Sequence, residues 1–105
     1  MAEEAFEQIV EALARTHEAV EAGKFFGVRC IKTNGKVFAA LHHSAMVFKL
    51  AGAAHAEALA LPGAALWDPS GEGQPFRAWV AVPAAQAAHW DELAEAAVTG
   101  MEGHR

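Results

Sequence analysis

The chain has 105 residues, the length of one domain that can bury a hydrophobic core of its own. Its single cysteine cannot form an internal disulfide, and no stretch approaches the ~18 consecutive apolar residues of a membrane span. The formal net charge of -5 argues against general nucleic-acid binding. The acidic start of the chain, with apolar residues spaced among charges, is not the pattern of a signal peptide. We therefore expect one cytoplasmic domain over residues 1–105.

The charges are unevenly distributed along the chain. Residues 1–23 hold six acidic and one basic side chain, residues 24–77 three acidic and six basic, and residues 78–105 four acidic and one basic. Charged side chains usually only solvate a surface. The pattern is therefore typical of two acidic helices that flank a mildly basic sheet.

The first predicted element is an amphipathic helix over residues 3–22. Its apolar positions recur at spacings of three and four and form one stripe. Gly23 is a natural stop, because glycine takes the left-handed cap conformation at little cost. The stripe consists of Phe6, Ile9, Val10, Leu13, His17 and Val20.

Residues 26–50 have the pattern of three antiparallel strands. Asn34-Gly35 is a strong hairpin signal, because a type I′ turn requires positive φ at both positions. A second two-residue turn is predicted at His43-Ser44. The strands are Val28–Thr33, Lys36–His42 and Ala45–Leu50.

The second half of the chain predicts a helix, one or two strands and a last helix. The alanine-rich segment is helix-prone and must end before Pro62, because the residue before proline avoids the α region. Pro83 suits the first turn of the last helix, where its missing N–H is no loss. The elements are Ala53–Leu61, Ala64–Trp67, Phe76–Val82 and a helix that ends near Thr99, with a loop at 68–75.

This order predicts an α+β fold. It is a two-layer sandwich with helices packed on a single antiparallel sheet of four to five strands, in the order helix, three strands, helix, one to two strands, helix.

Side chains alternate along a strand, so two-residue turns sort the sheet residues onto two faces. One face is almost purely apolar and is expected to form the core; it collects Val28, Cys30, Val37, Ala39, Leu41, Met46, Phe48, Leu50, Phe76, Ala78, Val80 and Val82. The second face mixes large apolar with basic side chains beside Ala40, His42 and Ala81. Its candidate binding residues are Arg29, Ile31, Phe38, Val47, Lys49, Arg77 and Trp79.

A face that only contacts water would carry fewer large apolar side chains than this one. Three alternatives remain for it. A helix or the 68–75 loop of the same chain covers it, a second copy binds it in a homodimer, or it binds a ligand or nucleic acid. Interleaved aromatic and basic side chains on a sheet can stack on bases and neutralise phosphates.

Motifs for catalysis and metal binding are missing from the sequence. The six histidines lack ligand spacing, with neither HExxH nor His-x-His nor CxxC present. Cys30 lies on the predicted core face, where a cysteine is an inert small hydrophobe. Neither serine lies in a GxSxG context. We therefore predict no catalytic residues, no metal, no cofactor and no enzymatic activity.

Several stretches, in their order and spacing, resemble the TfoX amino-terminal domain family. They are Phe25-Phe26-Gly27, Cys30–Leu41, Val47–Leu50, Leu61-Pro62-Gly63, Asp68–Gly71 and Trp79–Pro83. The resemblance covers roughly Phe25 to Met101 and implies a two-layer sandwich similar to YjbR-like and secretion-chaperone-like domains. The family is named after a bacterial regulator of DNA-uptake competence and has no agreed catalytic motif.

The resemblance therefore implies a non-enzymatic interaction or regulatory module that acts through protein partners or homodimerisation. The alternative is that nucleic acid or an anionic ligand binds the basic and aromatic sheet face.

Overall fold

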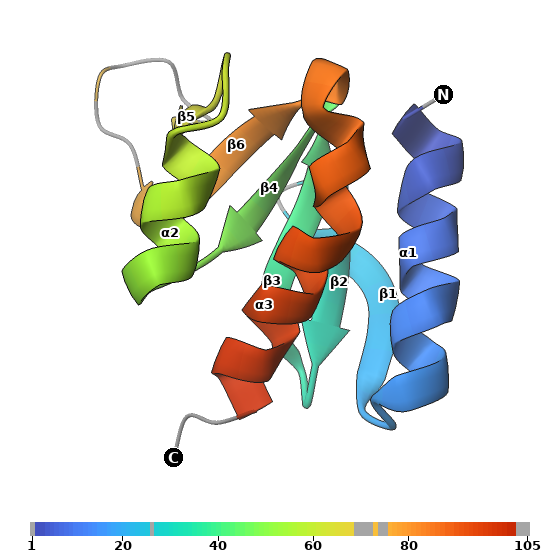
Figure 1. Ribbon diagram of the computed structural model, residues 1–105. Coiled ribbons are helices and arrows are strands. Elements are labelled where there is room, and N and C mark those ends of the chain that lie inside the picture. The colour runs from blue at the N-terminus through green and yellow to red at the C-terminus, as the bar shows by residue number, and fades with distance from the viewer. Residues whose placement is uncertain (1, 26, 69–72, 74–75, 103–105) are drawn as a thin grey trace.

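The computed structural model describes residues 2–25, 27–68, 73 and 76–102, which form one layer of helices on one layer of strands (Figure 1). The helices are α1 (Ala2–Thr16), α2 (Gly52–Leu59) and α3 (Trp90–Glu102), with a 3₁₀ helix η1 (Ala84–His89) directly before α3. The strands are β1 (Val20–Phe25), β2 (Val28–Thr33), β3 (Lys36–His42), β4 (Ala45–Lys49), β5 (Ala65–Trp67) and β6 (Phe76–Pro83).

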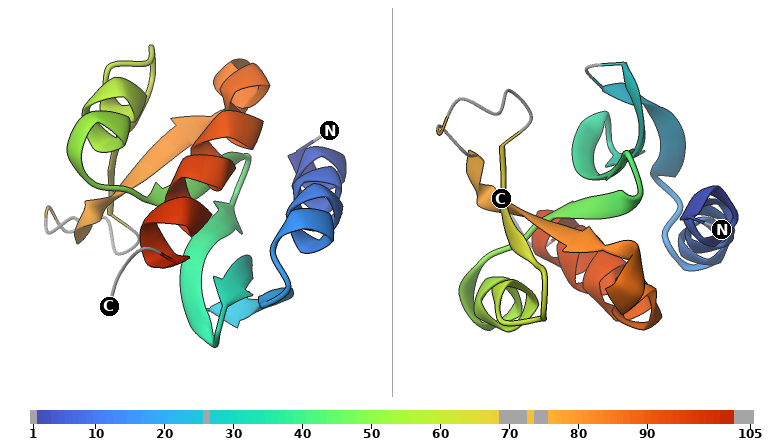
Figure 2. Two further views of the ribbon diagram at one scale, coloured as in Figure 1. Left: turned by 60° about the horizontal axis from the view of Figure 1, so that its bottom comes forward. Right: turned by 90° about the horizontal axis from the view of Figure 1, so that it is seen from above.

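The six strands form one sheet in the order β1-β2-β3-β4-β6-β5, and all neighbouring strands are antiparallel. The three α-helices lie on one side of this sheet (Figure 2). The predicted α+β fold with a single antiparallel sheet is thereby confirmed. The predicted number of four to five strands is wrong, because the sheet has six.

The missed strand is β1, which occupies the end of the predicted first helix. α1 ends at Thr16, and β1 pairs with β2 along its whole length. Val20 fits the helical stripe by its spacing, yet it is buried in the same core from a strand. Gly23 is not a helix stop but lies opposite Cys30, where a Cβ would approach the side chain of Lys32 to 2.7 Å. Glycine therefore leaves room for Lys32 to lie across β1.

Both predicted hairpin turns are present with two residues each. Asn34 and Gly35 take φ angles of 52° and 78°, as a type I′ turn requires. His43 takes a φ angle of 59° in the second turn, although neither residue of that turn is a glycine. The register of β4 against β3 is therefore the predicted one.

A β-bulge in β3 changes which side chains share a face of the sheet. Lys32 of β2 pairs with Val37, but the preceding residue Ile31 pairs with Ala39, so that Phe38 is an additional residue in β3. This shifts the register by one residue. Because side chains alternate with a period of two, the shift places β2, together with Val37 and Phe38, on the faces opposite to those expected relative to Ala39 and Leu41.

The main core lies between the sheet and the helices. Trp90 is fully buried there, and its indole N–H donates a hydrogen bond to the carbonyl oxygen of Val82 at 3.2 Å. Each large apolar side chain buried in this way contributes about 1.5–3 kcal/mol to the free energy of unfolding. The other large, fully buried side chains of this core are Phe6, Ile31, Phe38, Met46, Phe48, Val80, Val82 and Val98.

Candidate functional site

The structure separates the predicted binding residues. Ile31 and Phe38 are fully buried in the core beneath the helices. Arg29 lies on the same side, with its guanidinium 5.0 Å from the centre of the Phe6 ring and paired with the carboxylate of Glu7. The prediction that these three residues share the second sheet face is wrong. The bulge in β3 shifts the β2–β3 register by one residue, which places their side chains on the helical face.

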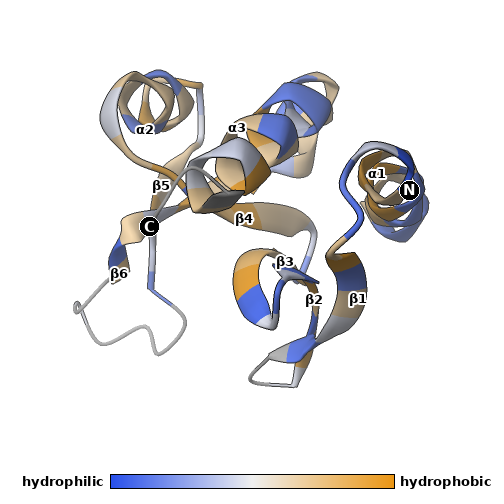
Figure 3. Cartoon of the chain, turned by 90° about the horizontal axis from the view of Figure 1, so that it is seen from below, coloured by the Kyte–Doolittle hydropathy of each residue, from blue (hydrophilic) through white to orange (hydrophobic). Residues whose placement is uncertain are grey.

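The other four predicted residues lie at β4 and β6. The face of the sheet turned away from the helices is called the open sheet face (Figure 3). Val47 is fully buried in the cluster on this face. Lys49 is exposed and lies directly opposite Trp79 in the β4–β6 ladder. Trp79 is half-buried, and Arg77, two residues before it, is exposed. The structure therefore places Lys49 opposite Trp79 on the open sheet face, with Arg77 two residues before Trp79 in β6.

Val28, Cys30 and Val37 were predicted in the core, and this is wrong for the same reason. They belong to a second, smaller cluster on the open sheet face. Cys30 is nevertheless fully buried. Burial raises the pKa of its thiol, which the charge of Lys32 and a backbone hydrogen bond from Gly23 partly offset. A buried thiol that keeps its proton is a weak nucleophile.

The second cluster is built around Trp67, a residue to which the sequence assigned no role. Trp67 comes from the short strand β5 and is only 3% exposed. The only sequence signal for this role was a tryptophan at the end of a predicted strand. It could not identify the cluster, because the neighbours of Trp67 come from distant parts of the chain. The cluster consists of Cys30, Ala40, Val47 and Trp67, with Val28, Val37, Trp79 and Ala81 packed against it.

Trp67 contacts three other rings. Its ring centre lies 5.6 Å from that of Phe76, 5.6 Å from that of Trp79 and 5.7 Å from that of His42. Its indole N–H donates a hydrogen bond to Nδ1 of His42 at 3.3 Å. Nδ1 can accept this bond only while it carries no proton. Burial and the neighbouring His43 lower the pKa of His42, which favours the neutral ring.

Two aromatic and two basic residues lie at the end of β4 and the start of β6, three of them exposed and Trp79 half-buried. We call this group the aromatic–basic corner: Lys49, Phe76, Arg77 and Trp79. Phe76 was predicted in the core, but it is 39% exposed, because the first residues of β6 extend past the end of β4. The backbone of the corner is held by hydrogen bonds from Leu50 N to Ala78 O (2.9 Å) and between His55 Nε2 and Arg77 O (2.8 Å).

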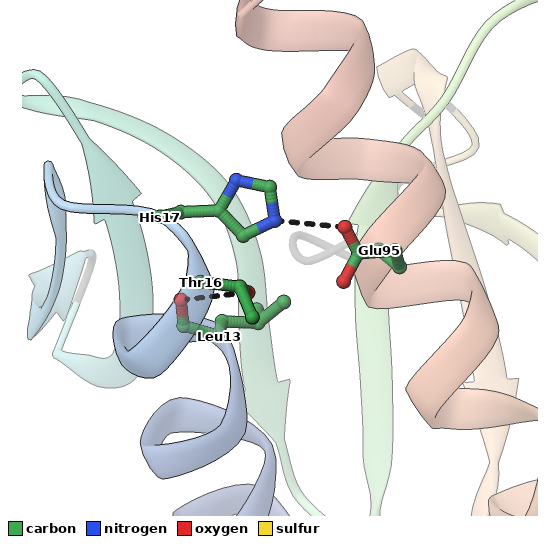
Figure 4. Close-up of polar contacts among 4 residues, drawn as sticks. All are labelled: Leu13, Thr16, His17 and Glu95. Carbon is green, nitrogen blue, oxygen red and sulfur yellow. Dashed lines mark hydrogen bonds and ion pairs between the residues drawn. The ribbon is translucent and has the colours of Figure 1, made fainter.

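Two histidine–carboxylate pairs lie on the helical side of the molecule. His17, just after α1, places Nε2 2.7 Å from Oε2 of Glu95 on α3 (Figure 4). His89 and Glu92 pair at 2.9 Å within the chain segment that leads into α3. Within residues 2–25, 27–68, 73 and 76–102, no three His, Cys, Asp or Glu side chains are placed to hold a metal ion. The His17–Glu95 pair links the end of α1 to α3. Beside it, the hydroxyl of Thr16 donates a hydrogen bond to the carbonyl oxygen of Leu13 (Figure 4).

Comparison of the chain with family models, with curated proteins and with solved structures finds no match in any of the three. The resemblance to the TfoX amino-terminal domain family therefore stays a prediction from the residues quoted above. Among the described residues, no helix is long and apolar enough to cross a membrane.

Proposed function

We propose that this protein is a non-enzymatic, cytoplasmic interaction module of the TfoX amino-terminal domain type, and that it binds a protein partner through the aromatic–basic corner. One observation carries the proposal. Exposed and half-buried aromatic and basic residues are neighbours there on β4 and β6, where hydrogen bonds fix the backbone. The protonated, buried thiol of Cys30 supports a binding role rather than nucleophilic catalysis.

The residue types of the corner are those that dominate protein–protein binding energies. Tryptophan and arginine are enriched among residues whose truncation costs more than 2 kcal/mol. Phe76 and Trp79 both pack against Trp67, so they lose little conformational entropy when a partner covers them. Lys49 and Arg77 beside them favour a partner segment that carries acidic side chains among apolar ones.

A homodimer through the open sheet face is less favoured than a different protein partner. Ile31 and Phe38 were half of the large apolar side chains that motivated such a dimer, and both are buried in the main core. Val47 is also fully buried, beneath its own cluster. The exposed surface that remains is a small corner rather than a broad apolar face.

Nucleic-acid or anionic-ligand binding is the alternative at the same corner. Lys49 directly opposite Trp79 could contact a phosphate while the indole stacks on a base. Arg29, a third predicted phosphate contact, instead pairs with Glu7 on the helical side. Two basic side chains give fewer phosphate contacts than the face that the sequence predicted, which favours the protein partner.

The test compares two labelled probes of equal net charge: a peptide of alternating glutamate and leucine, and a single-stranded oligonucleotide. Fluorescence anisotropy at physiological salt measures both against the protein. We expect the peptide to bind, and Arg77→Ala and Trp79→Ala each to weaken it about tenfold, which is ~1.4 kcal/mol. Lys36→Ala, an exposed base at the β2–β3 turn, is the charge-matched control for Arg77→Ala.

The outcomes separate the two candidates. Binding of the oligonucleotide alone, with loss in Arg77→Ala and Trp79→Ala, favours the alternative. Absence of binding of either probe at ~1 mM, or equal weakening by Lys36→Ala and Arg77→Ala, contradicts a binding role of the corner.

A further inference from the structure

A groove runs between α2 and α3, on the helical side of the molecule. The two helices lie side by side and run in opposite directions (Figure 1). Two cavities of about 270 and 240 Å³ lie between them, and both are lined by Ala54 and Ala96. The cavities are therefore neighbouring parts of one groove, whose walls include the small or apolar side chains Ala54, Ala58, Leu61, Leu93, Ala96 and Ala97.

The helix α2 has apolar surface beyond the groove as well. Only His55 and Glu57 of its eight residues are polar or charged. Ala53, Ala56 and Leu59 are exposed, with Leu59 at 37%. A helix that is apolar on all sides is normally buried on all sides. The outer surface of α2 is therefore unusually apolar for a helix that only the sheet and α3 contact.

The acidic side chains of the groove are at the larger cavity. Glu57 of α2 and Glu92 of α3 line it, and Glu92 pairs there with His89 at 2.9 Å. The smaller cavity is lined by apolar residues except for Lys49 at the end of β4. Lys49 is paired with Trp79, and paired residues point to the same face, so its side chain extends toward the open sheet face. An occupant that fits therefore carries positive charge at the larger cavity and apolar groups at both.

The spacing of the cavities sets the shape of that occupant. Leu93 lines the larger cavity and Gly100 the smaller one, seven residues further along α3. Seven helical residues rise by about 10 Å. This is also the distance between positions i and i+7 on another helix, which is how helices dock into grooves.

We propose that the α2–α3 groove binds an amphipathic helix of another protein, with two apolar anchor residues seven positions apart and lysine or arginine beside the anchor that enters the larger cavity. The anchors fill the two cavities, and the basic side chains pair with Glu57 and Glu92. The small side chains of Ala54 and Ala96 between the cavities let the backbone of the docked helix approach. This second surface is on the helical side of the sheet, and the end of β4 at Lys49 borders both it and the aromatic–basic corner.

The experiment uses a helical peptide with two leucines seven residues apart and two lysines beside one of them, titrated into the full chain by isothermal calorimetry. We expect one peptide to bind per chain. A peptide of the same composition with its leucines five residues apart is expected to bind at least tenfold more weakly, because only one leucine can enter a cavity.

Matched variants locate the binding. Ala54→Leu fills the groove and is expected to weaken binding at least tenfold, whereas Ala56→Leu on the exposed side of α2 leaves it unchanged. Glu57→Gln with Glu92→Gln weakens binding, whereas Glu3→Gln with Glu11→Gln on α1 changes the net charge equally and does not. Circular dichroism checks that each variant is folded. If Ala54→Leu does not fold, the glutamine variants still test the proposal.

Several results would overturn the proposal. They are absence of binding at ~1 mM peptide, equal affinity for the two peptides, and equal weakening by the two glutamine pairs, which would indicate nonspecific charge attraction. Sedimentation that shows a dimer broken by Ala54→Leu and kept by Ala56→Leu would assign the groove to a second copy of the chain instead.

Discussion

The two faces of the sheet bury apolar side chains by different means. The helical face is covered by α1, α3 and α2, of which α1 has an apolar stripe that was readable in the sequence, and it buries large side chains from both helices and strands. The open sheet face has a cluster whose central residue, Trp67, comes from a three-residue strand at the edge of the sheet. The difference shows that one aromatic side chain from the sheet edge can bury the middle of a face that no helix covers.

The largest expected effect separates the two faces at adjacent residues of β4. Phe48 points to the main core and Val47 to the second cluster, and both are fully buried. Phe48→Ala is expected to lower the free energy of unfolding by about 3–5 kcal/mol, and Val47→Ala by about 1–2 kcal/mol, because fewer atoms are removed from a smaller cluster. Urea unfolding measures both values. Equal losses would mean that the open sheet face is packed as extensively as the core.

The second prediction concerns pH and belongs to the open sheet face alone. The pKa of His42 is lowered in the folded protein, so the unfolded chain binds this proton more tightly. Stability due to His42 is therefore fully present above the ordinary histidine pKa of about 6.5 and decreases as the pH falls below it, until the folded protein takes up the proton too. Protonated Nδ1 would also face the indole N–H of Trp67, which leaves two donors without an acceptor.

The variant His42→Asn isolates this contribution, because its side-chain oxygen can accept the hydrogen bond and does not titrate. Unfolding free energies of wild type and variant are compared between pH 7.5 and 5. We expect the loss of stability at low pH to be smaller in His42→Asn than in wild type. His43→Asn, at the adjacent exposed position, is the control and should keep most of the loss. Parallel pH curves for wild type and His42→Asn would contradict the prediction.

Much of this organisation follows from local sequence signals. Asn34-Gly35 and His43-Ser44 were predicted as turns, and the faces of β4 and most of β6 followed from them. The β1 strand was missed because Val20 continues the helical spacing of the first stripe. A helix end is only marginally stable, so pairing with a neighbouring strand, here β2, can override the helical spacing of the sequence.

The candidate site was harder to predict because it depends on contacts between distant segments. No glycine or proline marks the bulge at Phe38, yet this single additional residue moves Arg29 and Ile31 to the helical face. Trp67 contacts His42, which precedes it by 25 residues, and no periodicity links them. A register shift and a long-range aromatic contact therefore decided which predicted residues share the corner.

The third prediction compares basic side chains on the two faces. Arg29 packs over Phe6 and pairs with Glu7, whereas Lys49 is exposed opposite Trp79. Arg29→Met keeps most of the packing and loses a partly exposed ion pair, so we expect a loss of at most ~1 kcal/mol that shrinks at high salt. Lys49→Met is expected to leave stability unchanged within ~0.5 kcal/mol. Thermal unfolding at low and high salt measures both, and a salt-independent loss in Arg29→Met would mean that the ion pair contributes nothing.

The last prediction is a gain in stability, on the helical face of the sheet. The hydroxyl of Thr33 is buried at the end of β2 and has no hydrogen-bond partner among the described residues. A buried hydroxyl without a partner costs free energy, and valine has nearly the same shape and suits a strand. Thr33→Val is therefore expected to raise the free energy of unfolding by about 1 kcal/mol, or the melting temperature by roughly 4–8 °C. Thr16→Val is the control, because the hydroxyl of Thr16 donates to the carbonyl of Leu13 at 3.4 Å and its removal brings no such gain. A lower melting temperature for Thr33→Val would show that this hydroxyl is hydrogen-bonded in solution, and that the helical face has no unsatisfied polar group at this position.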